Sequence, residues 1–266
     1  MKKTVIPFVL LSLLLISEQG FSQAKLLWSD EFSVDGLPDQ YKWTYDVGDH
    51  GWGNNELQLY VKASLENSRV ENGHLIIEAR KDESKTKGYT SARILTRGIA
   101  SWQYGYIEVK AKLPEGIGTW PAIWMLPEEN RHGGWPKNGE IDIMEHVGYD
   151  PGVVHGTVHT EAFNHSIGTQ KGKQIQVPDF NQEFHVYGID WTKEKIDFLM
   201  DGEIYFTFEN TGGDYKEWPF DQPFHLILNI AVGGNWGGQK GVNPDIWPQR
   251  MEIDYVRVFD RKPIKD

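Results

Sequence analysis

The chain has 266 residues, a net charge of −11 and no cysteine. An acidic chain is repelled by nucleic acids and by anionic membranes, which argues against both as partners. No disulfide can hold the fold, and the length suits one large all-β domain.

The first residues have the composition of an export signal. Lys2 and Lys3 are basic, residues 5–16 are apolar but too few to span a membrane, and small residues at positions 20 and 22 fit a cut after Ser22. We therefore predict a signal peptide over residues 1–22 and a single domain over residues 23–266. The protein is then secreted or periplasmic, makes no membrane contact after cleavage, and is expected to be a monomer.

Short alternating segments separated by Gly and Pro predict strands along the rest of the chain. Apart from residues 139–148, the predicted strands cover residues 25–32, 69–80, 91–98, 104–113, 120–126, 153–160, 184–191, 195–200, 203–208, 224–232 and 251–259. Asn72-Gly73 and Asp201-Gly202 predict tight hairpin turns, and residues 46–60 predict an irregular loop. The pattern predicts an all-β fold, a jelly-roll β-sandwich of two curved antiparallel sheets with a cleft on its concave face.

The stretch over residues 139–148 carries the chemistry. Its β-branched residues favour a strand, on which Glu140 and Asp142 share a face. Glu145 is five residues from Glu140 and falls on the opposite face of a regular strand. One extra residue corrects this, so we predict a β-bulge near Ile143 or Met144 that brings all three carboxylates to one face.

Crowded carboxylates repel each other, so ionisation of one raises the pKa of another. A pair of Glu side chains closing to about 5–5.5 Å is what a retaining glycoside hydrolase needs, with one nucleophile and one acid/base. Three other interpretations compete with this one. They are a solvated polar strand face, a metal cluster of Asp142, Glu145 and His146, and a structural calcium site.

The segment Glu140-Ile-Asp-Ile-Met-Glu145 resembles the active-site signature of glycoside hydrolase family 16, in the form with the extra residue that is found in laminarinase-like endo-β-1,3-glucanases. Four further segments agree: Trp52-Gly-Asn-Asn-Glu56-Leu-Gln58, Trp120-Pro-Ala-Ile-Trp124-Met-Leu, Ala231-Val-Gly-Gly-Asn-Trp236 and Met251-Glu-Ile-Asp-Tyr-Val-Arg257. The resemblance runs from about residue 26 to residue 259. It implies the jelly-roll fold, a β-glucan substrate and catalysis by Glu140, Asp142 and Glu145, with no cofactor for the reaction.

The resemblance and the residue types also imply the substrate-binding side chains. Aromatic rings can stack on sugar rings, and polar groups can bind the hydroxyls. The expected set is Asn55, Glu56, Arg97, Trp120, Trp124, Trp135, His159 and Trp236. The alternative for Asn55 is a turn residue, and the alternative for His159, a candidate partner of Glu145 or of the leaving oxygen, is a structural histidine.

The family resemblance implies one further site, a structural calcium ion on the convex face. Its ligands would be Glu31, the carbonyl of Gly73 and Asp254. The expected function is endo-acting, retaining cleavage of β-1,3-glucosidic bonds in laminarin-type glucans. The alternatives are a mixed-linkage β-glucanase, another polysaccharide hydrolase of the same fold such as an agarase, and a glucan-binding sandwich without activity.

Overall fold

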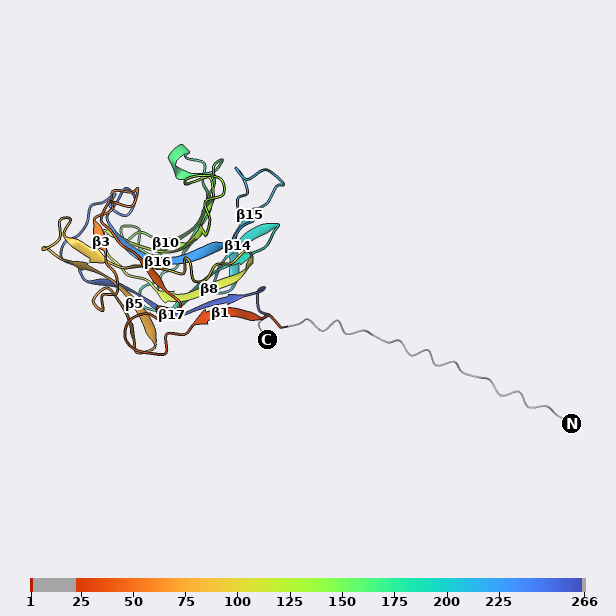
Figure 1. Cartoon of the computed structure of the whole chain (residues 1–266), viewed down its shortest axis with the longest axis horizontal. Helices are drawn as coiled ribbons and strands as arrows, with labels where there is room; N and C mark the ends of the chain where they lie inside the picture. Colours follow the sequence, from red (N-terminus) through yellow and green to blue (C-terminus); the bar gives the residue numbers. More distant parts are fainter. Residues whose placement is uncertain (2–22, 265–266) are drawn as a thin grey trace.

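The computed structural model describes Met1 and residues 23–264. The predicted signal peptide therefore lies outside the described residues, apart from Met1, and remains a prediction. The regular structure of the described chain is strand, apart from one short 3-10 helix, η1 (His165–Ile167). The all-β prediction is confirmed. Figure 1 shows the two layers, with β10 and β16 in one and β8 and β17 in the other.

The larger sheet contains ten of the described strands, in the order β15-β14-β13-β8-β17-β5-β6-β3, with β1 on β17 and β4 on β5. Their bounds are β1 (Leu26–Asp30), β3 (Gln58–Tyr60), β4 (Ser68–Glu71), β5 (His74–Lys81), β6 (Tyr89–Ser91), β8 (Gly105–Lys112), β13 (His185–Trp191), β14 (Lys195–Met200), β15 (Glu203–Glu209) and β17 (Gln249–Phe259). Its pairs are antiparallel except for β3 with β6, which is parallel.

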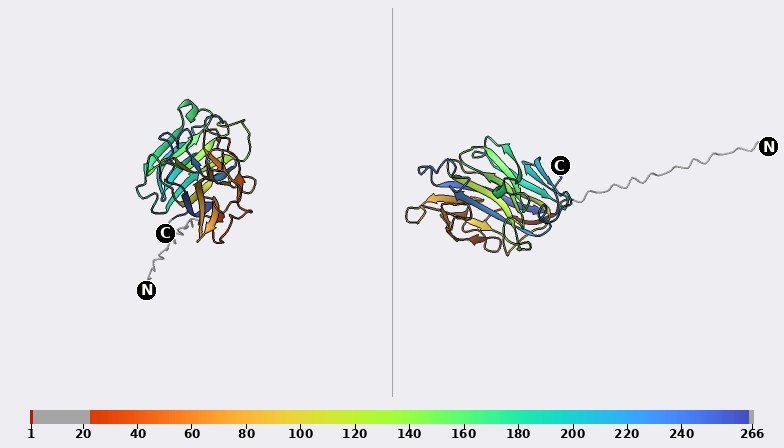
Figure 2. Two further views of the ribbon diagram at one scale, coloured as in Figure 1. Left: turned by 90° about the vertical axis from the view of Figure 1, so that its left-hand side faces the viewer. Right: turned by 90° about the horizontal axis from the view of Figure 1, so that it is seen from above.

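The smaller sheet contains seven of the described strands, in the order β12-β11-β10-β9-β16-β7-β2. Their bounds are β2 (Thr44–Asp46), β7 (Arg93–Leu95), β9 (Thr119–Pro127), β10 (Glu140–His146), β11 (Val153–His159), β12 (Lys171–Gln176) and β16 (Phe224–Val232). Figure 2 shows from two further sides how this sheet covers the larger one.

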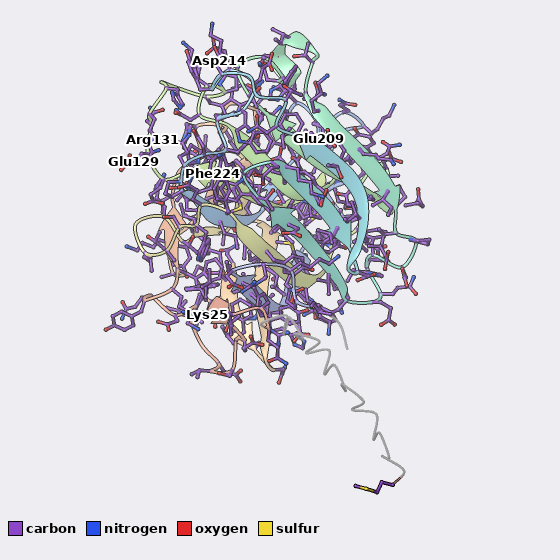
Figure 3. All side chains as sticks on the ribbon, turned by 90° about the vertical axis from the view of Figure 1, so that its right-hand side faces the viewer. Lys25, Glu129, Arg131, Glu209, Asp214 and Phe224 are labelled. Atoms are coloured by element: carbon purple, nitrogen blue, oxygen red, sulfur yellow. The ribbon has the colours of Figure 1, made fainter. Side chains whose placement is uncertain are left out.

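The core lies between the sheets, because each sheet turns one apolar face inward. On β8, Ile107 and Val109 are buried and Glu108 and Lys110 are partly exposed, as their alternation predicts. Every residue of β16 is buried, since it is central in its sheet. Figure 3 labels Phe224 of β16 among the side chains that fill the interior.

Two predicted hairpin turns are confirmed. Asn72 and Gly73 have φ values of 54° and 79° between β4 and β5, and Asp201 and Gly202 have 51° and 88° between β14 and β15. Positive φ at both central positions matches the right-handed twist of the strands on either side. The strand predicted over residues 91–98 is wrong in its second half, because the chain turns after Leu95.

Candidate active site

The bulge on β10 is confirmed by its pairing on both sides. Asp142 pairs with Thr157 of β11, and the next paired residue is Glu145, opposite His155. On the β9 side the register shifts between Asp142 and Met144. Ile143 and Met144 are both buried, with 1% and 0% of their surface exposed. The extra residue turns Glu145 back to the face that carries Glu140 and Asp142.

These carboxylates line one cavity of about 430 Å³ on the concave face of the smaller sheet. The cavity runs across the strands, because β10, β9, β16 and β7 each contribute side chains to it. One wall comes from residues 50–56 and the other from residues 165–166. Its aromatic lining residues are His50, Trp52, Tyr60, Trp120, Trp124, Trp135 and His165.

Each glutamate accepts a hydrogen bond from a different indole. Trp120 Nε1 donates to Glu145 Oε1 at 3.0 Å, and Trp135 Nε1 donates to Glu140 Oε2 at 3.0 Å. Trp120 comes from β9, two residues before Ala122, which pairs with Glu145, whereas Trp135 comes from the loop before β10. The two carboxylates are thus held in place separately, and each donor favours the ionised form of its own partner.

Burial dominates the electrostatics of the acids. Burial, and then the charge of Glu145, raises the pKa of Glu140 to about 8. Burial raises the pKa of Glu145 to about 7, against the hydrogen bond from Trp120. Burial and the charges of both glutamates raise the pKa of Asp142 well above its usual range. At neutral pH each glutamate is therefore partly protonated, and the protonated form of Asp142 is favoured.

His159 lies beside Asp142 rather than beside Glu145. Its Nε2 is 3.4 Å from Asp142 Oδ2 and 3.9 Å from Glu140 Oε1. Burial, with a smaller effect from His165, lowers the pKa of His159 to about 4, so the ring is neutral at neutral pH. The expected partnership with Glu145 is not what the structure shows.

The alternative metal cluster of Asp142, Glu145 and His146 is wrong. His146 points into the core, where its ring packs 4.6 Å from Phe180 and its Nε2 accepts a hydrogen bond from the amide of Gly152. Among the described residues, the group spaced to hold a cation is Glu140, Asp142 and His159, whose nearest oxygen and nitrogen atoms lie within 4.8 Å of one another.

Glu56 and Arg93 form the far wall of the cavity. Glu56 is buried and accepts from Gln58 at 2.5 Å, and burial raises the pKa of its carboxyl. Arg93 lies between the rings of Trp52 and Trp124, 4.7 Å from each. Sequence reasoning missed Arg93 and Trp52. Arg93 could have been found, because on the strand predicted over residues 91–98 it shares a face with the expected Arg97.

Asn55 and Arg97 do not reach the cavity. Asn55 has a φ of 56° and donates to Asn235 Oδ1 at an exposed site, while its neighbour Asn54 lines the cavity. Asn55 is therefore the turn residue of the alternative interpretation. Arg97 is about half exposed and pairs with Asp46 at 2.7 Å, because the chain turns away after Leu95.

Trp124 and Trp236 take different positions around the acids. Trp124 lines the cavity, and its indole donates to Asn229 Oδ1 at 2.7 Å rather than to a carboxylate. Trp236 lies behind Trp120, with ring centroids 5.5 Å apart. It supports the Trp120 indole and is outside the residues that line the cavity.

The segment with η1 adds a wall that the sequence did not predict. Asn164 accepts a hydrogen bond from the amide of Ser166 and caps this short helix. His165 then lies 4.9 Å from the ring of Trp135. Both His165 and Ser166 line the cavity next to Glu140.

The residues of the implied calcium site are already paired with cations. Glu31 accepts two hydrogen bonds from Arg257, at 2.9 and 2.8 Å. Asp254 pairs with Lys110 at 2.8 Å. Calcium takes about six to eight oxygen ligands, and two of the three implied ligands are already paired with cations, so these residues do not fit the ion as they stand. Calcium binding stays an untested prediction of the resemblance, and these ion pairs argue against it.

Within the described residues, no helix has the length and apolar character that crossing a membrane requires. A β-sandwich with paired glutamates on one strand and aromatic walls around them belongs to the class of polysaccharide-cleaving enzymes. The chain belongs to glycosyl hydrolases family 16, whose family model matches residues 39–257.

Its relatives agree over most of the chain. It is 58% identical over 242 residues to a "Beta-glucanase" of Rhodothermus marinus, covering 88% of this chain and 85% of that protein. The crystal structure of the laminarinase from Rhodothermus marinus matches with a TM-score of 0.88 and 57% identity, covering 90% and 98% of the two chains. A non-specific endo-β-1,3(4)-glucanase of the same family, crystallised with an oligosaccharide in its active site, matches with a TM-score of 0.86 and 49% identity over 90% and 95%.

Proposed function

We propose that the protein is an endo-acting, retaining glycoside hydrolase that cleaves β-1,3-glucosidic bonds in laminarin-type β-glucans. The observation that carries this is the bulged strand, with Glu140, Asp142 and Glu145 on one face of one cavity. The relatives described above support the substrate class, because their names are β-glucanase and laminarinase.

The first half of the reaction is attack by Glu140. Its carboxylate attacks the anomeric carbon and forms a glycosyl-enzyme, while Glu145 gives its proton to the leaving oxygen. The pKa of Glu145, about 7, keeps part of this group protonated at neutral pH. In the second half, Glu145 takes a proton from water, and the water releases the sugar from Glu140.

Asp142 sets the charge of Glu140. Burial and the charges of its two neighbours raise the pKa of Asp142 well above its usual range, which favours its protonated form. A hydrogen bond from a protonated Asp142, together with the one from Trp135, favours the ionised form of Glu140 that must attack. His159, whose ring is neutral at neutral pH, lies beside Asp142 and Glu140 and adds no charge there.

A second candidate is a mixed-linkage β-glucanase. It is favoured by the likeness to an endo-β-1,3(4)-glucanase that is described as non-specific. The cavity has an open wall of aromatic rings, which tolerates more than one linkage, because rings contact the faces of sugars rather than their bonds. We also propose that the protein acts as a secreted or periplasmic monomer.

The function is tested with purified protein on laminarin, mixed-linkage glucan, agarose and carrageenan, with sizing of the products. We expect internal cleavage of laminarin to be fastest, and Glu140→Gln to abolish it. Proton NMR of the first-formed reducing sugar should show retained β configuration. Faster cleavage of mixed-linkage glucan would favour the second candidate, and an inverted product would refute the two-step reaction.

A further inference from the structure

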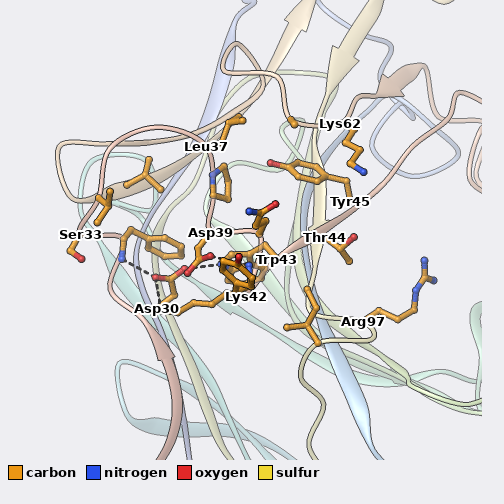
Figure 4. A pocket seen from close by; sticks show the side chains of 18 residues that line it. Asp30, Ser33, Leu37, Asp39, Lys42, Trp43, Thr44, Tyr45, Lys62 and Arg97 are labelled. Carbon is orange, nitrogen blue, oxygen red and sulfur yellow. Dashed lines mark hydrogen bonds and ion pairs between the residues drawn. The ribbon is translucent and has the colours of Figure 1, made fainter.

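A second hollow lies beyond the edge of the smaller sheet, with a volume of about 850 Å³. It is formed by residues 30–45, which come from β1, the loop after it and β2, together with residues 62–63, 70, 97 and 99. Figure 4 shows Leu37, Tyr45 and Lys62 around it, with Trp43 in its centre. None of its lining residues lines the catalytic cavity.

The hollow and the catalytic cavity are connected through one carboxylate. Asp46 Oδ2 is 3.2 Å from Arg93 Nε, and Asp46 Oδ1 is 2.7 Å from a terminal nitrogen of Arg97. Arg93 lines the catalytic cavity and Arg97 lines the hollow. The two sites thus adjoin each other at Asp46.

Their order along the sheet also matters. The catalytic cavity crosses β10, β9, β16 and β7, and the next strand in the same direction is β2, whose residues line the hollow. From β10 to β2 there are four strand spacings, or roughly 19 Å at about 4.8 Å each. A polymer that lies across the strands at Glu140 and extends in this direction therefore arrives at the hollow.

The charges of the hollow favour an uncharged ligand. Asp30 accepts from Trp43 Nε1 at 2.8 Å and pairs with Lys42 at 3.1 Å, so the charges at the floor cancel. The charge of Arg97 is likewise opposed by Asp46. An anion would find two of the three cations that line the hollow, Lys42 and Arg97, already paired, whereas the hydroxyls of a neutral sugar can bond to both partners of such pairs.

The rim offers the surfaces that sugars use. Tyr41 lines the hollow with 80% of its surface exposed, and Leu37 lines it with 45% exposed. A tyrosine ring gives a flat apolar face and a polar edge, as stacking on a pyranose requires. Lys62 adds hydrogen-bond donors next to Tyr45 (Figure 4).

We propose that this hollow is a distal binding site for the same β-glucan chain that is cut in the catalytic cavity. It holds sugar units several positions from the cleaved bond and so favours long chains over short ones. The proposal rests on the proposed function, since it takes its ligand from that reaction. It also gives Arg97 a sugar-binding place outside the catalytic cavity.

The test compares kcat/KM on β-1,3-gluco-oligosaccharides of increasing length and on laminarin. The variants are Tyr41→Ala, Lys62→Ala and the double variant, none of which touches the catalytic cavity. In the wild type we expect kcat/KM to rise again at the length that reaches the hollow. In Tyr41→Ala this rise should shrink by about two- to tenfold, the size of one aromatic contact, with short substrates unchanged.

Two variants serve as controls. Tyr41→Phe keeps the ring and should keep most of the rise with length. Lys193→Ala removes an exposed lysine from the turn between β13 and β14, which lines neither the hollow nor the catalytic cavity, and should change nothing.

The outcomes separate this proposal from the proposed function. Equal losses on short and long substrates, or a length profile that the double variant leaves unaltered, would overturn the distal site while hydrolysis stands. Absence of hydrolysis in the wild type on every length would instead refute the proposed function. In that case, retardation of Glu140→Gln in a laminarin gel, reduced by the Tyr41→Ala change, would still support binding at the hollow.

Discussion

The two indole donors allow the titrations of the two glutamates to be tested separately. Activity needs Glu140 ionised and Glu145 protonated. Because the pKa of Glu145 is about 7 and that of Glu140 about 8, the acidic limb of the pH profile reports Glu145 and the alkaline limb reports Glu140. Each indole nitrogen lies 3.0 Å from its carboxylate oxygen and stabilises the ionised form. Replacing either Trp with Phe removes this bond and raises the pKa of that one glutamate.

The magnitude follows from the bond strength. A hydrogen bond to a charged group contributes about 1.5–3 kcal/mol, and one pKa unit corresponds to about 1.4 kcal/mol. Water enters the cavity and replaces part of the lost bond, so we expect a shift of about one unit. Trp120→Phe should move the acidic limb to higher pH and narrow the profile. Trp135→Phe should move the alkaline limb to higher pH and broaden it.

The assay is kcat/KM on laminarin from pH 4 to pH 10, roughly the range that spans both groups, with each profile scaled to its own maximum so that losses of sugar binding cancel. Trp124→Phe is the matched control, because its indole donates to Asn229 and should leave both limbs in place. An alkaline limb that moves in Trp120→Phe would mean that Glu145, and not Glu140, has the higher pKa of the two. Limbs that move in neither variant would refute the role of the indoles.

Three further outcomes are expected. With azide and an activated aryl glycoside, Glu145→Ala should form the β-glycosyl azide, because azide attacks the glycosyl-enzyme. Glu140→Ala should form the α-glycosyl azide, because azide attacks the substrate directly. Swapped anomers in the NMR spectrum would reverse the assignment of the two glutamates. Deleting Met144 should lower kcat/KM by at least about 100-fold, since misplacing a catalytic group by about 1 Å has that effect. A deletion variant that is folded and fully active would refute the bulge argument. The implied calcium ligands are already paired with cations. We therefore expect the protein to melt at the same temperature in chelator and in excess calcium. A higher melting temperature in calcium would show that the ion displaces those cations.

The sequence predicted the parts of the site that follow from alternation along one strand. Glu140, Asp142 and Glu145 can share a face only if one residue is inserted between them, and that parity argument found the bulge. The strand edges of the sandwich were less predictable. The strand β12 has the sequence Lys-Gly-Lys-Gln-Ile-Gln with no apolar alternation, because it is an exposed edge that pairs only with β11.

The residues that were missed depend on backbone angles and on contacts between distant segments. Asn54 and Asn55 are neighbours of the same type, and only the positive φ of Asn55 decides which of them enters the cavity. Arg93 is held between Trp52 and Trp124, which come from a loop and from another strand. No local pattern in the sequence indicates a guanidinium held between two aromatic rings, so the resemblance directed attention to Arg97 instead.

The bulge itself has a physical reason beyond the parity of the carboxylates. An extra residue interrupts the ladder of backbone hydrogen bonds between β10 and its neighbours, which costs about 1 kcal/mol if one net hydrogen bond is lost. Burying the side chain of Met144 contributes about 1.5–3 kcal/mol, and Ile143 is buried beside it. The core therefore stabilises the irregular backbone, and the two anchored side chains hold the backbone of Glu145 in position. A catalytic acid on a bulge is then as well positioned as one on a regular strand, since its neighbours are fixed by packing rather than by the ladder.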